Sequence, residues 1–297
     1  MLNTLRGILV LFLITLITLI GIGPMVLVAL FKVAIPNAAF RRWCARLVML
    51  IAETWAEGCR GIIALLINTE WEVRGNMDIN QENSYLLLSN HQSWVDIAAL
   101  VQVFNGRVPY YKFFLKQELI WVPLLGLAFW ALDYPFMKRY SREYLEKHPE
   151  MKNRDLEATR EACEKCRGIP VTVVNFPEGT RFTPAKAQQQ DSPYRHLLRP
   201  KAGGISFVMA SIGDQIHSVL DVSMIYPEGV PGFWDFLTNK VKRVVVEAHQ
   251  FPLDQQWVRG DYRNDPEFRA EFQQWLSGFW HEKDQRISEI RTELGMK

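Results

Sequence analysis

The segment YLLLSNHQSWVD, residues 85–96, places a histidine and an aspartate directly after an apolar run. An imidazole with one nitrogen held by a carboxylate keeps its other nitrogen free to remove a proton, as in the base–orienter part of a catalytic triad. The spacing also has a structural interpretation, because Ser93 can cap a helix in which Asp96 satisfies free backbone N–H groups. That interpretation does not explain Asn90 and His91, so both interpretations stay open at this point.

A second polar cluster, FPEGTR at residues 176–181, again follows an apolar run that is typical of a strand. Pro177 and Gly179 bend the chain, while Glu178 and Arg181 present a carboxylate and a planar cation from one tight loop. Taken alone, the cluster fits two explanations equally well. One is a binding loop, and the other is a turn with a surface ion pair of little energetic weight.

Short runs rich in β-branched and aromatic residues alternate with longer helical stretches after residue 67. We expect strands at residues 70–73, 85–89, 110–114, 134–137, 171–175, 218–225 and 241–248. We expect helices at residues 94–103, 118–127, 154–167, 202–211 and 266–292, and an exposed loop at 184–195. This alternation predicts an α/β fold with a largely parallel central sheet flanked by helices, and a ligand site beyond the strand ends.

The first 67 residues predict membrane-anchoring helices, separate from a domain over residues 68–297. No charged residue occurs from Gly7 to Phe31. A helix of that length spans about 37 Å, enough to cross a hydrocarbon layer of about 30 Å. Pro24 leaves a bent or partly inserted hairpin as an alternative to a straight span. A cleaved signal peptide is less favoured, because its apolar core is normally shorter.

A second apolar stretch at residues 47–67 carries a charged stripe at helical spacing, made by Arg42, Arg46, Glu53, Glu57 and Arg60. Such a helix suits the membrane surface, or packing on the domain, better than a second span. Cations follow the first apolar segment, namely Lys32, Arg41, Arg42 and Arg46. By the positive-inside tendency, they predict that the bulk of the chain lies in the cytoplasm.

Composition excludes several classes of protein. With 297 residues and 48% hydrophobic residues, the chain can bury a full core, and a net charge of +2 argues against nucleic acid as a partner. Four cysteines are too few for a disulfide scaffold, and we interpret the lone pair Cys163 and Cys166 as ordinary thiols. The sequence has no zinc-type histidine spacing, no G-x-S-x-G turn and no phosphate-binding loop, which argues against a metal site, a serine lipase and a kinase.

Together, the order NHxxxxD and then FPEGTR resembles the glycerolipid acyltransferase family, typified by 1-acylglycerol-3-phosphate acyltransferases. The resemblance covers residues 85–227, and the block at 134–139 is similar to another family motif, although Lys138 stands where many members have an acidic or polar residue. The block at 219–227 departs from the family pattern. With residues 198–204, it is similar to the branch containing lysocardiolipin acyltransferases, so the acceptor lipid stays open.

The resemblance implies an O-acyltransferase that moves a fatty acyl group from acyl-CoA or acyl carrier protein to 1-acyl-sn-glycerol 3-phosphate, giving phosphatidic acid. His91, oriented by Asp96, would be the general base, with no metal, no cofactor and no covalent intermediate. Reacylation of lysophosphatidylglycerol or lysocardiolipin, or a non-catalytic membrane scaffold, are the alternatives. The implied location is a bacterial inner membrane, among membrane lipids, with the catalytic domain on the cytoplasmic side.

The resemblance also implies residues that bind the acceptor. Arg139 and Arg181 would hold its phosphate, because a guanidinium can donate two parallel hydrogen bonds, and Lys201 is a weaker candidate. Glu178 would position the acceptor hydroxyls, unless a salt bridge to Arg181 makes it structural. The remaining expected substrate-binding residues are Asn90, Gly179 and Thr180.

Two further expectations concern the chemistry around the site. Backbone N–H groups near His91 or in the turn at 176–180 would stabilise the tetrahedral oxyanion. The apolar run at 119–130 is either a core helix or a membrane-dipping surface with an acyl-chain tunnel, because a helix that is apolar all round must be buried in protein or in lipid.

Overall fold

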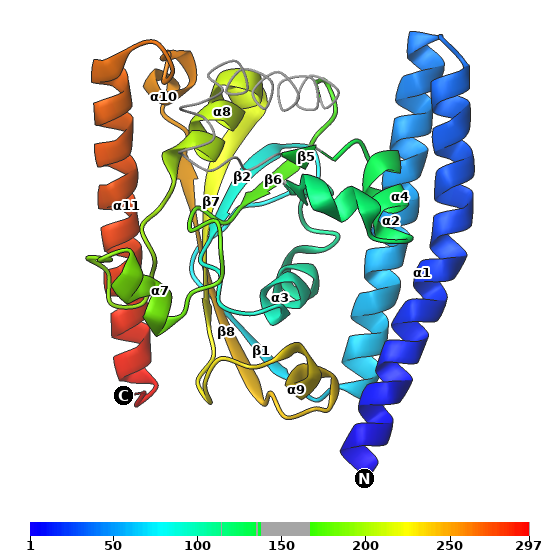
Figure 1. The fold of residues 1–297 in the computed structure, drawn as a ribbon, viewed down its shortest axis with the longest axis horizontal. Helices are drawn as coiled ribbons and strands as arrows, with labels where there is room; N and C mark the ends of the chain where they lie inside the picture. Colours follow the sequence, from blue (N-terminus) through cyan, green and yellow to red (C-terminus); the bar gives the residue numbers. More distant parts are fainter. Residues whose placement is uncertain (114, 135, 138–166, 297) are drawn as a thin grey trace.

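A mixed six-stranded sheet lies between two long helices at one side of the molecule and one long helix at the other (Figure 1). The computed structural model describes residues 1–113, 115–134, 136–137 and 167–296. The strand order is β1-β8-β7-β2-β6-β3. The strands are β1 (Glu70–Arg74), β2 (Ser84–Ser89), β3 (Tyr111–Phe113), β6 (Thr172–Asn175), β7 (Ile216–Ile225) and β8 (Arg243–Pro252).

Strand direction confirms the predicted, largely parallel α/β sheet. β7, β2, β6 and β3 run parallel to one another, and β1 runs parallel to β8. The exception is the antiparallel pair β7 and β8, which reverses the direction of β8 and β1. The neighbours β7, β2 and β6 therefore end at the same edge of the sheet, where α/β proteins usually bind ligands.

Helices cover both faces of the sheet, which explains why the central strands are continuous apolar runs. Leu87 of β2 packs in a core cluster with Leu100 of α3 (Val95–Phe104). Leu86 faces the other way and packs with Ile205 of α8 (Ala202–Ile212) and Phe272 of α11 (Pro266–Glu293). Each fully buried aliphatic side chain of this kind stabilises the fold by about 1.5–3 kcal/mol.

The N-terminal segment forms two helices that lie side by side, α1 (Leu2–Ala34) and α2 (Ala38–Leu66) (Figure 1). The Trp55 indole N–H donates to the Thr18 hydroxyl across the pair at 2.9 Å. The assigned helix α1 continues through Pro24. By length and composition α1 is able to cross a membrane, and only 17% of its most apolar stretch is buried.

Helix α2 packs against the rest of the protein through a buried stripe. Of the two settings expected for it, the membrane surface and packing on the domain, the structure shows packing on the domain. The stripe follows helical spacing and consists of Cys44, Val48, Ala52, Ala56, Cys59 and Ile63. Several of these residues share a core cluster with α1, α3 and the sheet. The predicted boundary between residues 67 and 68 falls in the link between α2 and β1, and the division into two domains stays a prediction.

The apolar run at 119–130 is not one helix. It forms the 3-10 helix η1 (Gln117–Trp121) and then α4 (Leu125–Ala131), with a break at Pro123, which lacks an N–H donor, and at Leu124, whose φ is 68°. Its apolar side chains are largely exposed, with Trp121 at 84% and Leu127 at 48%. Of the two alternatives for this run, the core helix does not fit the exposed side chains.

Two other elements differ from the predictions. Residues expected to form a loop begin with α7 (Pro184–Gln189), because Pro184 suits a first helical position and the Thr183 hydroxyl accepts from the Lys186 N–H. The strand expected at 134–137 is reduced to β5 (Phe136–Met137), which pairs with β4 (Leu115–Lys116) outside the main sheet. The helix expected at 154–167 lies outside the described residues except for its last position.

The remaining described elements are short and connect the larger ones. They are η2 (Gly213–Gln215), α9 (Phe233–Leu237) and α10 (Gln255–Arg259). Helix α9 follows β7 and lies against α1.

Candidate active site

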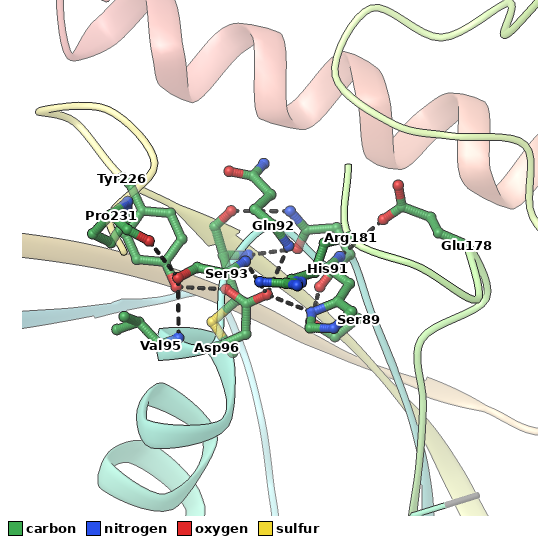
Figure 2. Close-up of polar contacts among 12 residues, drawn as sticks. Ser89, His91, Gln92, Ser93, Val95, Asp96, Glu178, Arg181, Tyr226 and Pro231 are labelled. Carbon is green, nitrogen blue, oxygen red and sulfur yellow. Dashed lines mark hydrogen bonds and ion pairs between the residues drawn. The ribbon is translucent and has the colours of Figure 1, made fainter. Parts of the chain in front are cut away.

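The side chains of His91 and Asp96 meet just past the end of β2. The His91 Nδ1 atom lies 2.8 Å from Asp96 Oδ2 (Figure 2). The Asp96 side chain is fully buried, whereas the His91 side chain is 19% exposed. Since Nδ1 is occupied by the carboxylate, Nε2 is the ring nitrogen left to exchange a proton with a substrate.

The Asp96 carboxylate is fixed by three further donors. Backbone N–H groups of Gln92 and Ser93 donate to Oδ2 at 2.7 and 2.9 Å, and the Tyr226 hydroxyl donates to Oδ1. An ionised carboxylate only accepts hydrogen bonds, so four donors aimed at it suit a buried charge. The carboxylate therefore cannot turn away from the His91 ring without leaving buried donors unpaired.

The contacts of Asp96 support the capping interpretation and are compatible with the catalytic one, which stays a prediction. The Ser93 hydroxyl accepts from the Val95 N–H at 3.1 Å, and Asp96 accepts in return from the Ser93 N–H. This arrangement at the start of α3 is close to a capping box, except that the Ser93 hydroxyl meets the N–H of Val95 and not that of Asp96. One carboxylate both closes the helix and orients His91, so the helix start itself holds the dyad in place.

Asn90 belongs to the core and does not reach a substrate surface. It is 0% exposed, and its side-chain amide donates to the Met224 carbonyl at 3.0 Å and accepts from the Met224 N–H at 2.8 Å. These two bonds continue the pairing of β2 with β7 past the last residue of β2. The expected substrate contact does not fit this position, because both ends of the amide are occupied within the fold.

Glu178 joins the two sequence motifs. One carboxylate oxygen accepts from the His91 N–H and the other from the Leu198 N–H, both at 2.8 Å. The side chain is 0% exposed. The described residues contain no ion pair between Glu178 and Arg181. The geometry thus favours a structural role for Glu178, as a bridge between backbones, over contact with acceptor hydroxyls.

Burial raises the pKa of Glu178 to about 8, although the backbone hydrogen bonds from Leu198 and His91 and the charge of Lys283 pull it downward. The folded protein therefore holds this proton more tightly than the unfolded chain, where the pKa is 4.5. Stability from this group is complete below the unfolded value and is lost as the pH rises through about 8.

We expect the melting temperature of the wild type, relative to that of a Glu178→Gln variant at the same pH, to decrease as the pH rises from 5 to 9. The variant loses one backbone hydrogen bond at every pH but has no proton to release here, so the difference between the two curves isolates this titration. Expressed as free energy of unfolding, this difference changes by at most about 1.4 kcal/mol per pH unit. A difference that stays constant or grows with pH would contradict the assignment.

Besides Glu178, the FPEGTR turn and the residue that follows it each make one contact that holds them against His91. The Phe176 ring stacks on the imidazole with centroids 4.3 Å apart, and the Phe182 N–H donates to the His91 carbonyl at 2.7 Å. The imidazole is thus held on one face by an aromatic ring and at Nδ1 by Asp96. Side-chain order of this kind is what a positioned base needs.

Cations surround the Gly179–Thr180 turn. The Arg181 guanidinium is exposed and lies 5.2 Å from the centroid of the Trp94 ring. Gly179 has a φ of +69°, and a side chain there would meet Lys201 Nζ at 3.3 Å, which places that ammonium beside the turn. Arg139, the other predicted phosphate ligand, lies outside the described residues.

Two residues of this region were missed from the sequence. Lys186 Nζ donates to the Thr180 hydroxyl at 2.8 Å and to the Arg181 carbonyl at 2.9 Å, and α7 is what brings it there. Tyr226 was also missed, and its only signal was its position directly after a predicted strand. Neither residue lies at a recognisable spacing from the histidine motif.

Most of the expected oxyanion donors are engaged within the protein. The N–H groups of His91, Gln92 and Ser93 donate to carboxylates, and the Gly179 N–H donates to the Phe176 carbonyl at 2.9 Å. An oxyanion site therefore stays a prediction, and its candidate donors are the other backbone N–H groups of the turn at 176–180.

Metal ligands and thiols add nothing to this site. The part of the chain that the structure describes has no group of three or more His, Cys, Asp or Glu side chains arranged for a metal ion. Cys44 and Cys59 are buried free thiols, and Cys163 and Cys166 lie outside the described residues. The expectation of a reaction without metal or cofactor stays a prediction.

The fold is of the α/β class, and at the ends of its parallel strands an imidazole is oriented by a buried carboxylate, an arrangement that suits general-base chemistry. The comparison with protein families agrees with this class. A family model described as acyltransferase matches residues 70–230, more than half of the chain, and the match contains both motifs. The chain belongs to the acyltransferase family.

The names of similar proteins mention two acceptor lipids, 1-acyl-sn-glycerol 3-phosphate and lysocardiolipin. The mouse 1-acyl-sn-glycerol-3-phosphate acyltransferase epsilon is 23% identical over 73% of this chain and 60% of its own length. The Danio rerio lysocardiolipin acyltransferase 1 is 24% identical over 80% of this chain and 60% of its own length. The human 1-acyl-sn-glycerol-3-phosphate acyltransferase alpha is 31% identical over 40% of this chain and 38% of its own length. The chain thus spans about 60% of the first two relatives.

A solved structure shares the fold over almost the whole chain. The crystal structure of PlsC, the 1-acyl-sn-glycerophosphate acyltransferase from Thermotoga maritima, superposes with a TM-score of 0.53 and 20% sequence identity. The superposition covers 97% of this chain and 98% of that one. At this identity the likeness concerns the fold alone.

Proposed function

We propose that this protein is a membrane-bound O-acyltransferase that moves a fatty acyl group from a thioester to 1-acyl-sn-glycerol 3-phosphate, giving phosphatidic acid. The observation that carries the proposal is the 2.8 Å contact between His91 Nδ1 and a fully buried Asp96 carboxylate. Family membership and the names of the relatives support acyl transfer to a lysophospholipid. The donor is acyl-CoA or acyl carrier protein.

In the proposed reaction, His91 Nε2 takes the proton of the acceptor hydroxyl as its oxygen attacks the thioester carbonyl carbon. A carbon–oxygen bond forms, and the carbonyl oxygen becomes an oxyanion. Collapse of this intermediate breaks the carbon–sulfur bond, and the proton on His91 passes to the departing sulfur. Asp96 stabilises the imidazolium that exists between these steps.

The acceptor phosphate would lie against the cations around the Gly179–Thr180 turn. Arg181 is exposed there, with Lys186 and Lys201 close to the same turn. A phosphate monoester carries a charge of about −1.5 to −2 near pH 7, whereas a phosphodiester carries about −1. Several cations therefore favour the monoester of lysophosphatidic acid over a lysolipid with a diester headgroup.

The membrane assignment rests on α1 and on the exposed apolar surface of α4 and η1. Helix α4 lies against α1, and Lys32 of α1 donates to the Ala131 carbonyl of α4 at 2.9 Å and pairs with Asp133. Because Trp121 and Leu127 are exposed beside an apolar helix, lipid is the environment that would cover them. By the positive-inside tendency, the catalytic domain lies on the cytoplasmic side, in a bacterium at the inner membrane.

Acyl transfer to a panel of acceptors tests the function. We expect purified protein with radiolabelled acyl-CoA or acyl carrier protein to acylate lysophosphatidic acid faster than lysophosphatidylglycerol or lysocardiolipin. An Arg181→Gln variant should raise the KM for lysophosphatidic acid about tenfold or more, since a charge-assisted hydrogen bond contributes about 1.5–3 kcal/mol. Arg259→Gln, at an exposed arginine of α10, is the matched control.

Preference for lysocardiolipin or lysophosphatidylglycerol would move the proposal to the remodelling alternative that the Danio rerio relative suggests. If the protein transfers an acyl group to none of the three acceptors from either donor, the proposed activity is wrong and the non-catalytic membrane scaffold becomes the favoured alternative. The preparation itself tests the membrane assignment, because release of the protein from membranes by alkaline carbonate would contradict an inserted α1.

A further inference from the structure

The C-terminal helix α11 lies outside the residues that the family model matches, yet it is tied to the catalytic histidine. The match ends at residue 230, and α11 begins at Pro266. The helix runs along the sheet on the side away from α1 and α2 (Figure 1). Its buried polar and aromatic side chains, Trp280, Lys283 and Asp284, are therefore candidates for a role that family membership does not assign.

A chain of three hydrogen bonds leads from α11 to the backbone of His91. The Trp280 indole N–H donates to the Leu198 carbonyl at 3.1 Å. The N–H of the same residue, Leu198, donates to Glu178 Oε2 at 2.8 Å, and Glu178 Oε1 accepts from the His91 N–H at 2.8 Å. Trp280, Leu198 and Glu178 are all 0% exposed, so water cannot replace any of these bonds without an opening of the core.

The segment that carries Leu198, residues 192–198, is held by a second side chain of α11. The Asp284 carboxylate accepts from the Arg195 N–H at 2.9 Å and from the His196 N–H at 2.8 Å. Leu197 of the segment packs in one buried cluster with Trp280. The segment therefore takes its position from α11 at several points, and the Leu198 N–H is delivered to Glu178 from a fixed backbone.

The buried cluster that contains Leu197 and Trp280 also supports Asp96, the other residue of the dyad. Ile225, the last residue of β7, packs with Trp280 and Ile287 of α11. The next residue, Tyr226, donates its hydroxyl hydrogen bond to Asp96. Helix α11 thus supports the backbone of His91 through Glu178 and the partner of Asp96 through β7.

A buried ion pair fixes how α11 is rotated against the sheet. Lys283 Nζ lies 2.5 Å from Asp221 Oδ1 of β7 and donates to the Val222 carbonyl at 2.6 Å. Arg286 pairs with the second oxygen of Asp221. Removing one partner of such a pair leaves an uncompensated buried charge, so the rotation of α11 has one strongly preferred value. That value points the Trp280 indole at Leu198.

We infer that Trp280 is a positioning residue for His91, acting through Leu198 and Glu178, and that Asp284 supports it by holding residues 192–198. The kinetic part of this inference rests on the proposed acyl transfer. Loss of the indole hydrogen bond releases the Leu198 backbone, and Glu178 then places the His91 N–H less tightly. Because His91 acts on the proton in the transition state, the loss falls on kcat and leaves acceptor binding almost unchanged.

The test is Trp280→Phe, which keeps a ring in the cluster and beside Lys283 but removes the N–H donor. We expect kcat to fall about tenfold, with the KM for lysophosphatidic acid within about twofold, since small misplacements of a reacting group reduce rates steeply. Trp275→Phe is the matched control, because Trp275 lies on the same helix in an aromatic cluster with Trp257 and Phe272. Its kcat should stay within about twofold of wild type.

A double-mutant cycle separates positioning from general stability. If Trp280 acts through Glu178, the variant with both Trp280→Phe and Glu178→Gln should have a kcat close to that of the worse single variant. Multiplicative losses, or equal kcat values for the Trp280→Phe and Trp275→Phe variants, would overturn the inference. All assays run well below the melting temperatures, so that unfolded protein does not lower the apparent kcat.

A second readout does not depend on turnover. In protein labelled with ¹⁵N-histidine, the ring resonances of His91, assigned with a His91→Gln variant, should shift or broaden in Trp280→Phe and not in Trp275→Phe. If the wild type transfers no acyl group, the proposed function fails, and this spectrum still decides the structural coupling. Unchanged His91 resonances in Trp280→Phe would overturn it.

Discussion

Replacing His91 with alanine is expected to lower kcat for acyl transfer by about 10³- to 10⁴-fold, because the acceptor hydroxyl loses its general base. The structure leaves Nε2 as the working nitrogen, since Nδ1 is held by Asp96 at 2.8 Å. No neighbouring group on the described chain can take over easily, because Glu178 is buried with both oxygens engaged. Initial rates at saturating lysophosphatidic acid measure the effect.

The chain offers a matched control for this substitution. His249 and Glu247 form another histidine–carboxylate pair at 2.7 Å, on β8, one of the two strands that run opposite to those that end at the site. His249→Ala should change kcat by about twofold or less, because surface and structural pairs carry no chemistry. Because the ring of His91 stacks on Phe176, His91→Gln should be tested beside His91→Ala to separate lost chemistry from lost packing. A His91→Gln enzyme with more than a tenth of wild-type kcat would rule out a base at this position.

Asp96→Asn is expected to lower kcat by about 10²- to 10⁴-fold, the range that spans general-base catalysis and an oriented histidine that loses its carboxylate. A neutral amide cannot stabilise the imidazolium, whichever way it turns. If its NH₂ group replaces Oδ2, it forces the wrong His91 tautomer and also meets the N–H donors of Gln92 and Ser93. If the NH₂ group replaces Oδ1, it faces the Tyr226 hydroxyl, and a neutral oxygen is left to accept from His91. The same initial-rate assay applies, with the KM for the acceptor expected to change little.

Asp133→Asn provides the control, because Asp133 is a half-buried carboxylate that pairs with Lys32 of α1. Its kcat should remain near that of wild type. Since Asp96 also closes the start of α3, the melting temperature of Asp96→Asn should fall as well, and circular dichroism must show a folded protein before rates are compared. A folded Asp96→Asn enzyme with at least a third of wild-type kcat would show that Asp96 only caps the helix.

Some features of the site were accessible from the sequence because they depend on neighbours along the chain. His91 follows the end of β2 by two residues, and Asp96 lies in the first turn of α3, so local geometry brings them together. The Pro and Gly of the FPEGTR turn likewise report a local bend, and Gly179 has the positive φ that such a turn requires. Sequence spacing is sufficient wherever contacts span only a few residues.

Other features depend on burial and on partners from distant segments. Asn90 and Glu178 were expected to bind the substrate, and in the fold their polar atoms have partners at Met224 and Leu198, from other parts of the chain. The apolar run at 119–130 read as a possible core helix, but the packing left it exposed beside α1. Exposure is a property of the assembled fold, so no count of apolar residues in one segment can supply it.

Short windows of the chain encode the α/β alternation, the apolar length of α1 and the two motifs, because hydrophobic period and local turn chemistry depend on neighbouring residues. The bridge of Glu178 between the motifs, the support of Asp96 by Tyr226 and the hydrogen bond from Trp280 of α11 to Leu198 arise only in the assembled fold. These contacts join residues 87 to 130 positions apart, or link α11 to a segment 82 positions away. Their partners were set by strand order and by the rotation of α11 on β7, which arise only when the whole core packs together.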